Sequence, residues 1–340
     1  MGFEVKGSSM CWRPVRAGVL AACRCLALAA ALVASPALAF AAERYVLIVV
    51  GAPGSTEHAE RHAEWREALA GVLEEQLDVP ADQMVSLSGD ATDETRQATR
   101  ENVEAAVEGF GSIMGADDVL LLVLMGHGTF DGIDAKFNLV GPDLESAEWE
   151  ALIEPVPGYV VFVNTTGASY PFLERLSADR RVIITATDSP AQRYDTVFAG
   201  FLAPAFSDAG SDLDKDGRVS IWEAFTFASV EVRRWYEQRG QLATERPLLE
   251  DTGDGQGLEA GQVGEDGHLA GRLFLDAESG GMAGADPELA QLVGRRNFLE
   301  NELADLKRKR DFMPPGDYDE ELERLVVAIA RISRQIRARS

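Results

Sequence analysis

VLLLVLMGHG, residues 119–128, is an unbroken apolar run that ends on a histidine between two glycines. An apolar run without alternation is typical of a strand buried on both faces, as in a parallel sheet covered by helices. Residues that follow the carboxyl end of such a strand lie at the edge where open α/β sheets build their sites. The sequence therefore predicts that His127 lies at a functional edge of a sheet.

Other apolar runs of strand length precede and follow this one. The expected strands are Tyr45–Val50, Gln83–Ser88, Val119–Met125, Tyr159–Val163 and Val182–Ala186. Between them, helical periodicity places Trp65, Leu69, Val72, Leu73 and Leu77 on one helical face and predicts a second crossover helix from about Arg100 to Phe110. Buried strands that alternate with amphipathic helices predict an α/β domain over residues 40–252, with a mostly parallel sheet flanked by helices.

An apolar strand that ends in His-Gly resembles the catalytic-histidine motif of the caspase and legumain-type cysteine peptidases. In that clan the next strand ends in a loop that carries the nucleophilic cysteine, typically spelled Asp-Ala-Cys-x-Ser-Gly. Here the loop after Tyr159–Val163 is Asn164-Thr165-Thr166-Gly167-Ala168-Ser169. Alignment of Asn164 with the family's aspartate places Thr166 at the cysteine position, and a shift by one residue places Gly167 there. The resemblance covers roughly residues 44–250 and implies a caspase-like fold; it includes Thr185-Ala186-Thr187-Asp188 after the fifth strand.

No cysteine lies in this loop, because Cys11, Cys23 and Cys25 all precede the first strand. Hydroxyls are far weaker acids than a thiol, whose pKa is about 8.5, so they need a well-placed base to act as nucleophiles. The first expectation is therefore a pseudopeptidase that acts as a binding or scaffolding module for an unknown protein or peptide, with His127 vestigial. The alternative is a peptide hydrolase in which Thr166 or Ser169, or the adjacent Thr165, attacks with His127 as general base.

A cleft that no longer cuts can still bind peptides. Polar side chains expected at its mouth are Thr129, Asp131, Asn164 and Asp188. Sites persist on folds independently of the original chemistry, so peptide binding remains open as an intermediate interpretation.

The strongest motif is an acidic stretch of twelve residues, Asp212-Leu213-Asp214-Lys215-Asp216-Gly217-Arg218-Val219-Ser220-Ile221-Trp222-Glu223. It fits the EF-hand loop, with Asp212, Asp214, Asp216, the Arg218 carbonyl, Ser220 and Glu223 as ligands and Gly217 at the sharp turn. Hard oxygen ligands in this order select Ca²⁺. The competing interpretation is a capping box, Ser220 with Glu223, for the helix expected from about Ile221 to Arg239. Asp251 and Asp254 form a weaker candidate that is equally well a polar turn.

The first 39 residues predict a cleavable signal peptide. Basic residues precede an apolar run, Leu26–Leu38, that ends in Ala37-Leu38-Ala39. Cleavage after Ala39 predicts a periplasmic or secreted protein. The run is shorter than the stretch of about 20 residues that crosses a bilayer, so no membrane span is expected. A lipoprotein anchor at Cys23 is the alternative.

The C-terminal part has a different pattern. Residues 253–285 are rich in glycine and predict a loosely ordered linker. Residues 286–340 predict a helical hairpin or coiled coil, because apolar residues keep heptad-compatible spacing on both sides of Met313-Pro314-Pro315-Gly316. Two such helices can satisfy each other as a packed appendage, or they can serve as an arm for homo-oligomer formation.

The net charge and the remaining histidines limit which partners and metal sites are expected. A net charge of -24 argues against nucleic acid and anionic lipid surfaces as partners. His58 and His62 have a zinc-compatible helical spacing, but no third ligand is apparent near them in sequence. Since Glu57, Glu60 and Glu64 surround them, a solvated helix face is the favoured interpretation.

Overall fold

The structure is a computed structural model that describes residues 1–2, 42–190, 192, 194–262, 264–276, 281–282, 292, 295–296, 299, 303, 306 and 313–337. The chain divides into two compact units, Met1–Phe40 and Ala41–Ser340. The predicted signal peptide and its cleavage site at Ala39 lie outside the described residues, apart from the first two residues.

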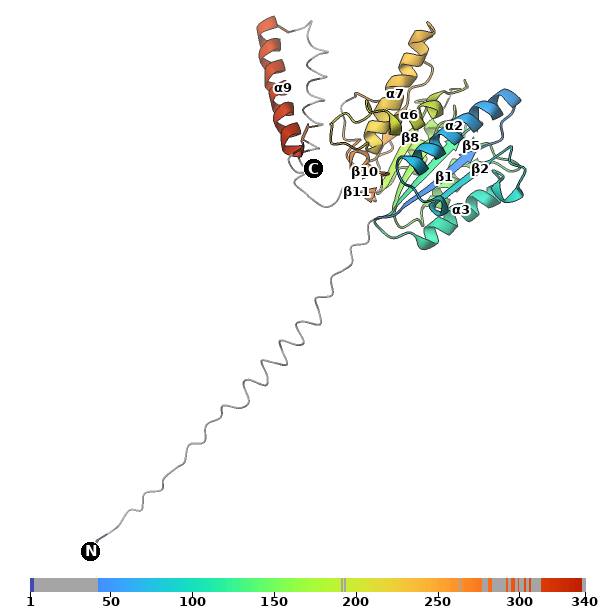
Figure 1. Cartoon of the computed structure of the whole chain (residues 1–340), viewed down its shortest axis with the longest axis horizontal. Coiled ribbons are helices and arrows are strands. Elements are labelled where there is room, and N and C mark those ends of the chain that lie inside the picture. The colour runs from blue at the N-terminus through green and yellow to red at the C-terminus, as the bar shows by residue number, and fades with distance from the viewer. Residues whose placement is uncertain are drawn as a thin grey trace. The chain divides into compact units, whose positions relative to one another are not determined.

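A six-stranded, mostly parallel sheet forms the centre of the second unit (Figure 1). Its strands follow the spatial order β2-β1-β3-β7-β8-β9. They are β1 (Arg44–Val50), β2 (Met84–Ser88), β3 (Val119–Met125), β7 (Tyr159–Asn164), β8 (Arg181–Thr185) and β9 (Leu248–Glu250). The first five are parallel and confirm the predicted α/β class, whereas β9 pairs antiparallel with β8.

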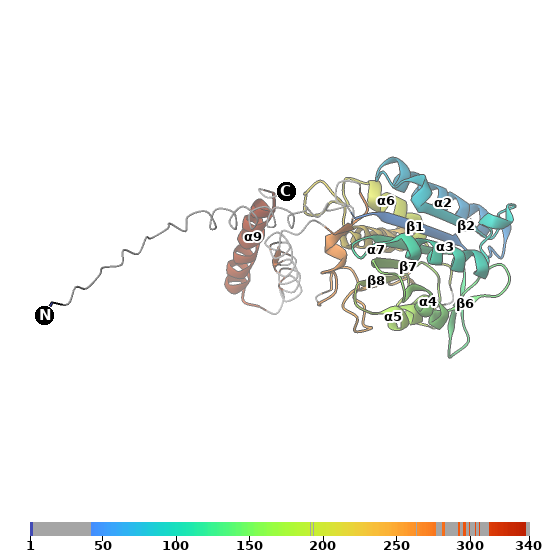
Figure 2. The same ribbon diagram turned by 90° about the horizontal axis from the view of Figure 1, so that it is seen from below.

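Helices cover both faces of this sheet (Figures 1 and 2). One face carries α2 (Thr56–Glu75), α6 (Leu202–Ser207) and α7 (Ile221–Gln238), and the other carries α3 (Arg100–Ile113), α4 (Ser146–Ile153) and α5 (Tyr170–Leu176). Because successive strand residues point to opposite faces, Leu121 and Val123 of β3 enter the first core and Leu120 and Leu122 the second. Burial on both faces explains why β3 is apolar throughout.

Short elements connect these layers. The single-turn 3₁₀ segments are Ala81–Gln83, Glu94–Arg96, Phe198–Phe201 and Ala270–Arg272. A small antiparallel sheet follows β3 directly and consists of β4 (Gly128–Phe130), β5 (Ala135–Phe137) and β6 (Leu144–Glu145). This sheet is not predictable from the sequence, because strands of two or three residues carry too little periodicity to be recognised.

Part of the stretch predicted as a linker is instead packed against the main domain. Ala270, Leu273 and Leu275 are buried in the core that contains α7. Strand β10 (Leu273–Phe274) pairs with β11 (Gly281–Met282). Glycine here serves tight turns and close packing: Gly267 has φ +95°, and a Cβ on it would lie 2.7 Å from the Trp222 ring. The α/β domain therefore extends beyond residue 252 and includes the buried residues Ala270, Leu273 and Leu275.

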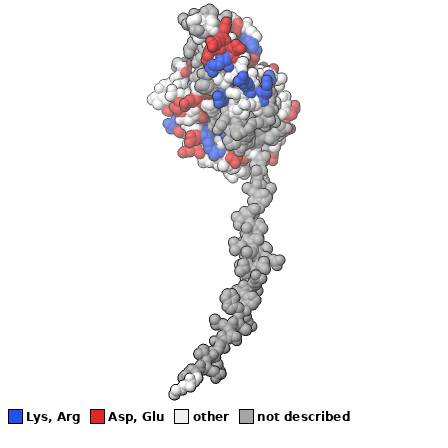
Figure 3. Space-filling model, turned by 90° about the vertical axis from the view of Figure 1, so that its left-hand side faces the viewer, with Lys and Arg blue, Asp and Glu red and all other residues white. Residues whose placement is uncertain are grey.

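The C-terminal region contains α9 (Pro315–Arg337) and single described helical positions between 292 and 306. Leu299 and Leu306 from the earlier segment pack with Leu325, Ile332 and Ile336 of α9 in one apolar cluster. Within the described part of the chain, no helix is both long and apolar enough to cross a membrane. On the described part of the face in Figure 3, acidic and basic side chains are interspersed.

Candidate functional site

His127 lies where the sequence predicted it, immediately beyond the carboxyl end of β3. Gly126 makes the turn out of the strand with φ +136°, a conformation that favours glycine. The His127 Nε2–H donates to the carbonyl of Pro53, 3.1 Å away in the loop after β1. Since β1 and β3 are in register from Arg44↔Val119 to Val50↔Met125, their carboxyl ends meet at one edge and bring these loops together.

The loop 164–169, which the sequence resemblance aligns with the peptidase cysteine loop, is buried and internally hydrogen-bonded. The Thr165 hydroxyl donates to the Leu124 carbonyl at 2.7 Å, and Asn164 Oδ1 accepts from the Thr166 amide at 3.0 Å. The Ser169 hydroxyl lies 3.0 Å from Thr187 Oγ1 and accepts from the Thr187 amide at 3.2 Å. Among the described residues, no hydrogen bond joins any of these hydroxyls to His127.

Thr166, at the aligned cysteine position, is fully buried, and its hydroxyl has no hydrogen-bond partner in the described part of the chain. A Cβ on Gly128 would lie 2.6 Å from Thr166 Oγ1, so this hydroxyl sits against the backbone of β4. A nucleophile needs both an open path to substrate and a base within hydrogen-bond reach. The arrangement around Thr166 provides neither.

A cleft of about 190 Å³ opens beside His127. Its lining residues come from the loops after β3 and β7 and from the segment before α6: Gly126, His127, Gly128, Thr129, Phe130, Gly167, Ala168, Pro190, Gln192, Tyr194, Asp195 and Thr196. Of the four polar residues predicted at the mouth, Thr129 lines the cleft, whereas Asn164 is buried and Asp188 pairs with Arg246 at 2.8 Å. Asp131 is exposed and caps its own turn by accepting from the Ile133 and Asp134 amides.

Three histidines meet next to this cleft, which the sequence analysis did not predict. His58 and His62 extend from α2, and their ring centroids lie 4.7 and 5.8 Å from that of His127. Asp195 Oδ2 lies 2.8 Å from His58 Nε2, and Asp195 Oδ1 lies 3.8 Å from His127 Nδ1. The predicted solvated face is wrong for His62, which is only 4% exposed, because the strand end that carries His127 packs over it. The missing partners are distant in sequence, so local spacing could not reveal them.

Burial and neighbouring charges tune this group. Burial lowers the pKa of His62 to about 4, and the charge of Arg61 acts in the same direction. Burial works to raise the pKa of Asp195, but the hydrogen bond with His58 and the nearby basic groups hold that pKa below its ordinary value. At neutral pH the cluster therefore contains an ionised Asp195 carboxylate and a neutral, buried His62 imidazole.

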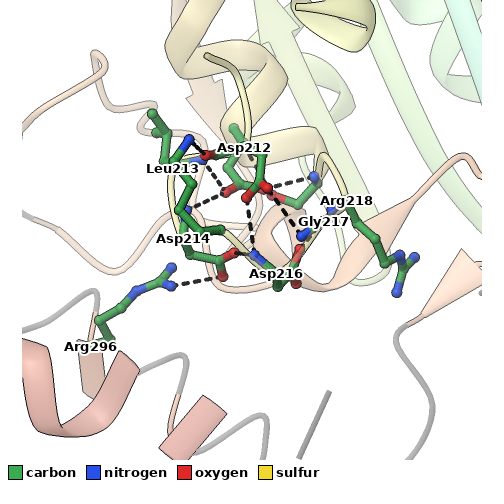
Figure 4. A network of polar contacts seen from close by, with 10 residues as sticks. Asp212, Leu213, Asp214, Asp216, Gly217, Arg218 and Arg296 are labelled. Atoms are coloured by element: carbon green, nitrogen blue, oxygen red, sulfur yellow. Dashed lines mark hydrogen bonds and ion pairs between the residues drawn. The ribbon is translucent and has the colours of Figure 1, made fainter. Parts of the chain in front are cut away.

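The acidic loop 212–223 has the internal geometry of a cation-binding turn (Figure 4). Carboxylate oxygens of Asp212, Asp214 and Asp216 lie within 4.8 Å of one another. Asp212 accepts from the amides of Asp216 and Gly217 at 3.2 and 3.1 Å, and Gly217 has φ +91°. Three carboxylates held together by backbone amides fit an oxygen-ligated divalent cation.

Glu223 closes this loop from the first turn of α7. Its Oε1 accepts from the Leu213 and Asp214 amides at 3.0 and 3.2 Å, and its Oε2 accepts from the Ser220 amide at 2.9 Å. Ser220 and Glu223 also form the capping box, so that interpretation is correct and compatible with a cation site. Burial raises the pKa of Glu223 to about 7 and that of Asp216 to about 6. For Glu223 to chelate an ion with both carboxylate oxygens, it must give up its hydrogen bonds with the Leu213, Asp214 and Ser220 amides.

Two arginines flank the loop. Arg296 Nη1 pairs with Asp214 Oδ2 at 2.8 Å, and both side chains are buried (Figure 4). The Arg218 guanidinium turns away from the acidic centre and forms a two-point pair with Asp276 at 2.7 and 2.9 Å. Arg218 can therefore contribute only its backbone carbonyl to an ion, as the sequence pattern requires.

No family model matches the chain, and no curated protein matches it. Among solved structures it is similar to protein GSU0716 from Geobacter sulfurreducens, with 14% sequence identity, coverage of 61% of this chain and 92% of that chain, and a TM-score of 0.38. A likeness this low carries no argument about the site.

Proposed function

We propose that this chain is an exported, calcium-binding pseudopeptidase on a caspase/legumain-like frame, and that it acts as a binding or scaffolding module. The buried loop at the aligned cysteine position carries this proposal. The side chains of Thr165, Thr166 and Ser169 are all buried. In the described part of the chain, the hydroxyls of Thr165 and Ser169 form hydrogen bonds with Leu124 and Thr187, and none with His127. A site without an accessible nucleophile binds ligands without forming a covalent intermediate.

The caspase-like part of the proposal is supported by the placement of two loops. The histidine follows the third strand of the sheet, and the hydroxyl-bearing loop follows its parallel neighbour β7 at the same edge. The predicted helical hairpin is supported by the apolar cluster between α9 and the preceding helical positions. Calcium binding is supported by the three converging carboxylates and the closing Glu223.

The cleft beside His127 is the proposed binding surface. Its volume of about 190 Å³ is smaller than the range of about 300–1,000 Å³ usual for drug-sized ligands. Such a volume accepts one side chain of an extended peptide. Tyr194, 68% exposed, offers an aromatic anchor at the rim.

Hydrolysis by Thr166 with His127 as base remains the second candidate. One observation favours it: the Thr166 hydroxyl lacks a hydrogen-bond partner among the described residues, so a rearranged loop would find it available. It requires Gly128 and Thr166 to move apart, since they are in contact in this structure.

The cleft is tested by peptide binding. Peptides that the parent chain retains from a random library serve as ligands. Tyr194→Ala is expected to lower the affinity for these peptides at least about 10-fold, because an exposed aromatic at a binding rim is a typical hot spot. Leu242→Ala is the matched control, since Leu242 is 91% exposed and does not line the cleft. Equal binding by the parent chain and both variants would show that the cleft is not the binding surface.

A further inference from the structure

We propose that His58, His127 and Asp195 bind one transition-metal dication of the zinc class, at a site separate from the acidic loop. Three of the chain's four histidines, His58, His62 and His127, gather at this point. The fourth, His268, lies in the turn before the 3₁₀ segment Ala270–Arg272. This inference goes beyond the proposed function, which assigns calcium to residues 212–223.

The spacing of the ligand atoms fits a single ion. One donor atom from each of His58, His127 and Asp195 lies within 4.8 Å of the others. Zinc takes nitrogen and oxygen ligands at about 2.0–2.1 Å, which places neighbouring ligand atoms of a tetrahedron about 3.3 Å apart. The two imidazole nitrogens face different oxygens of the same carboxylate, with His58 Nε2 2.8 Å from Asp195 Oδ2 and His127 Nδ1 3.8 Å from Asp195 Oδ1, and these distances lie on either side of that value. Small side-chain rotations would complete the site.

The ring of His127 is already oriented as a metal ligand. Its Nε2–H donates to the Pro53 carbonyl at 3.1 Å, and its Nδ1 faces Asp195. In a neutral ring this bond places the proton on Nε2 and keeps Nδ1 available to a metal. Metal-ligating histidines commonly donate their second ring N–H to a backbone carbonyl or carboxylate, which fixes the tautomer. This bond is therefore the outer-shell contact that a histidine ligand needs.

The scaffold around His58 is also fixed. Ser55 caps α2, and its hydroxyl accepts from the His58 amide at 3.2 Å, so His58 stands in the first turn of the helix. His62, one turn later, stacks against His58 with ring centroids 6.0 Å apart and packs against Trp65. His62 is buried, and its Nδ1 has no partner in the described part of the chain.

Ligand chemistry separates the two cations. Imidazole nitrogens suit zinc and its neighbours, whereas the all-oxygen set of Asp212, Asp214 and Asp216 suits calcium. Both His127 and Asp195 line the cleft, so the ion would keep one side toward it. Three protein ligands with an open position are the arrangement of zinc sites that accept an exogenous ligand.

The test is a calorimetric titration of the full chain with Zn²⁺ in the presence of excess calcium. Cys11, Cys23 and Cys25 are replaced by serine, so that their thiolates do not compete for zinc. The expected result is one Zn²⁺ per chain, with affinity lowered at least about 10-fold by His58→Gln and by Asp195→Asn. His268→Gln should leave zinc binding unchanged.

Unchanged zinc affinity in His58→Gln, or a loss of similar size in His268→Gln, would overturn the proposal. His58 and Asp195 are both partly exposed, so their variants should keep the fold. A calcium-dependent melting curve like that of the parent chain checks this independently. Co²⁺ in place of Zn²⁺ gives a second readout, because a tetrahedral site with imidazole ligands produces visible absorption that the His58→Gln variant should lose.

Discussion

Calcium is expected to raise the melting temperature of this protein by about 5–10 °C at an ion concentration near 100 times Kd. At that concentration, binding to the folded state alone contributes about 2.7 kcal/mol. Extracellular single-loop sites have Kd values of about 10⁻⁴ to 10⁻³ M, so roughly 10–100 mM calcium meets this condition. Thermal unfolding with calcium and with a chelator measures the shift.

Variants of the acidic loop make this prediction specific. Asp212→Ala and Glu223→Ala should each reduce the calcium-dependent shift, since each removes a ligand. Glu223→Ala should also lower stability without calcium, because Glu223 bonds the Leu213 and Asp214 amides and caps α7. Asp131→Ala is the matched control, because its carboxylate accepts from the Ile133 and Asp134 amides in a separate turn. No calcium effect on the parent chain would refute the calcium site.

Glu245 should make stability fall as pH rises from about 5 to 8. Its buried carboxylate accepts from the Val197 amide at 2.6 Å, the Phe198 amide at 3.0 Å and the Tyr236 hydroxyl at 2.9 Å. Burial raises the pKa of Glu245 from its ordinary 4.5 to about 7, although these hydrogen bonds lower it. Between those values the folded protein retains a proton that the unfolded chain releases. That contribution to stability is complete below about pH 4.5 and is lost as pH rises through about 7.

Glu245→Gln should therefore cost more stability at pH 5 than at pH 8, by on the order of 1–3 kcal/mol. An amide cannot ionise, so the variant lacks the proton-linked term at both pH values. Urea unfolding of the parent chain and the variant at the two pH values gives the difference directly. Glu237→Gln is the control, because Glu237 is exposed near the end of α7. A cost that is the same at both pH values would contradict the raised pKa.

Long buried strands were predictable because their sequence pattern is local. The five parallel strands were expected from apolar runs, and β3 begins and ends at the predicted residues. The antiparallel strand β9 was missed because its three residues carry no period, and its pairing in the folded domain, with β8 and between Leu249 and Leu258, makes it a strand. The glycine-rich segment was misjudged for a different reason. Glycine composition does not distinguish a free linker from turns packed against Trp222.

The acidic loop and the histidine cluster differ in how far apart their residues lie in the sequence. The acidic loop could be found from sequence because its ligands lie within twelve residues of one another. The histidine cluster could not, because α2, the end of β3 and the loop at Asp195 come together only in the folded sheet. Burial of Thr166 was likewise invisible, since it depends on the backbone of Gly128 lying against the hydroxyl.

Peptide turnover tests the central claim most directly. The purified chain is incubated with a broad peptide library in calcium and a zinc-selective chelator, and mass spectrometry detects cleaved products. We predict that every peptide remains intact, because the hydroxyls of the 164–169 loop are buried and have no described hydrogen bond to His127. Cleavage that persists in the chelator and is abolished by both His127→Ala and Thr166→Ala would contradict the account.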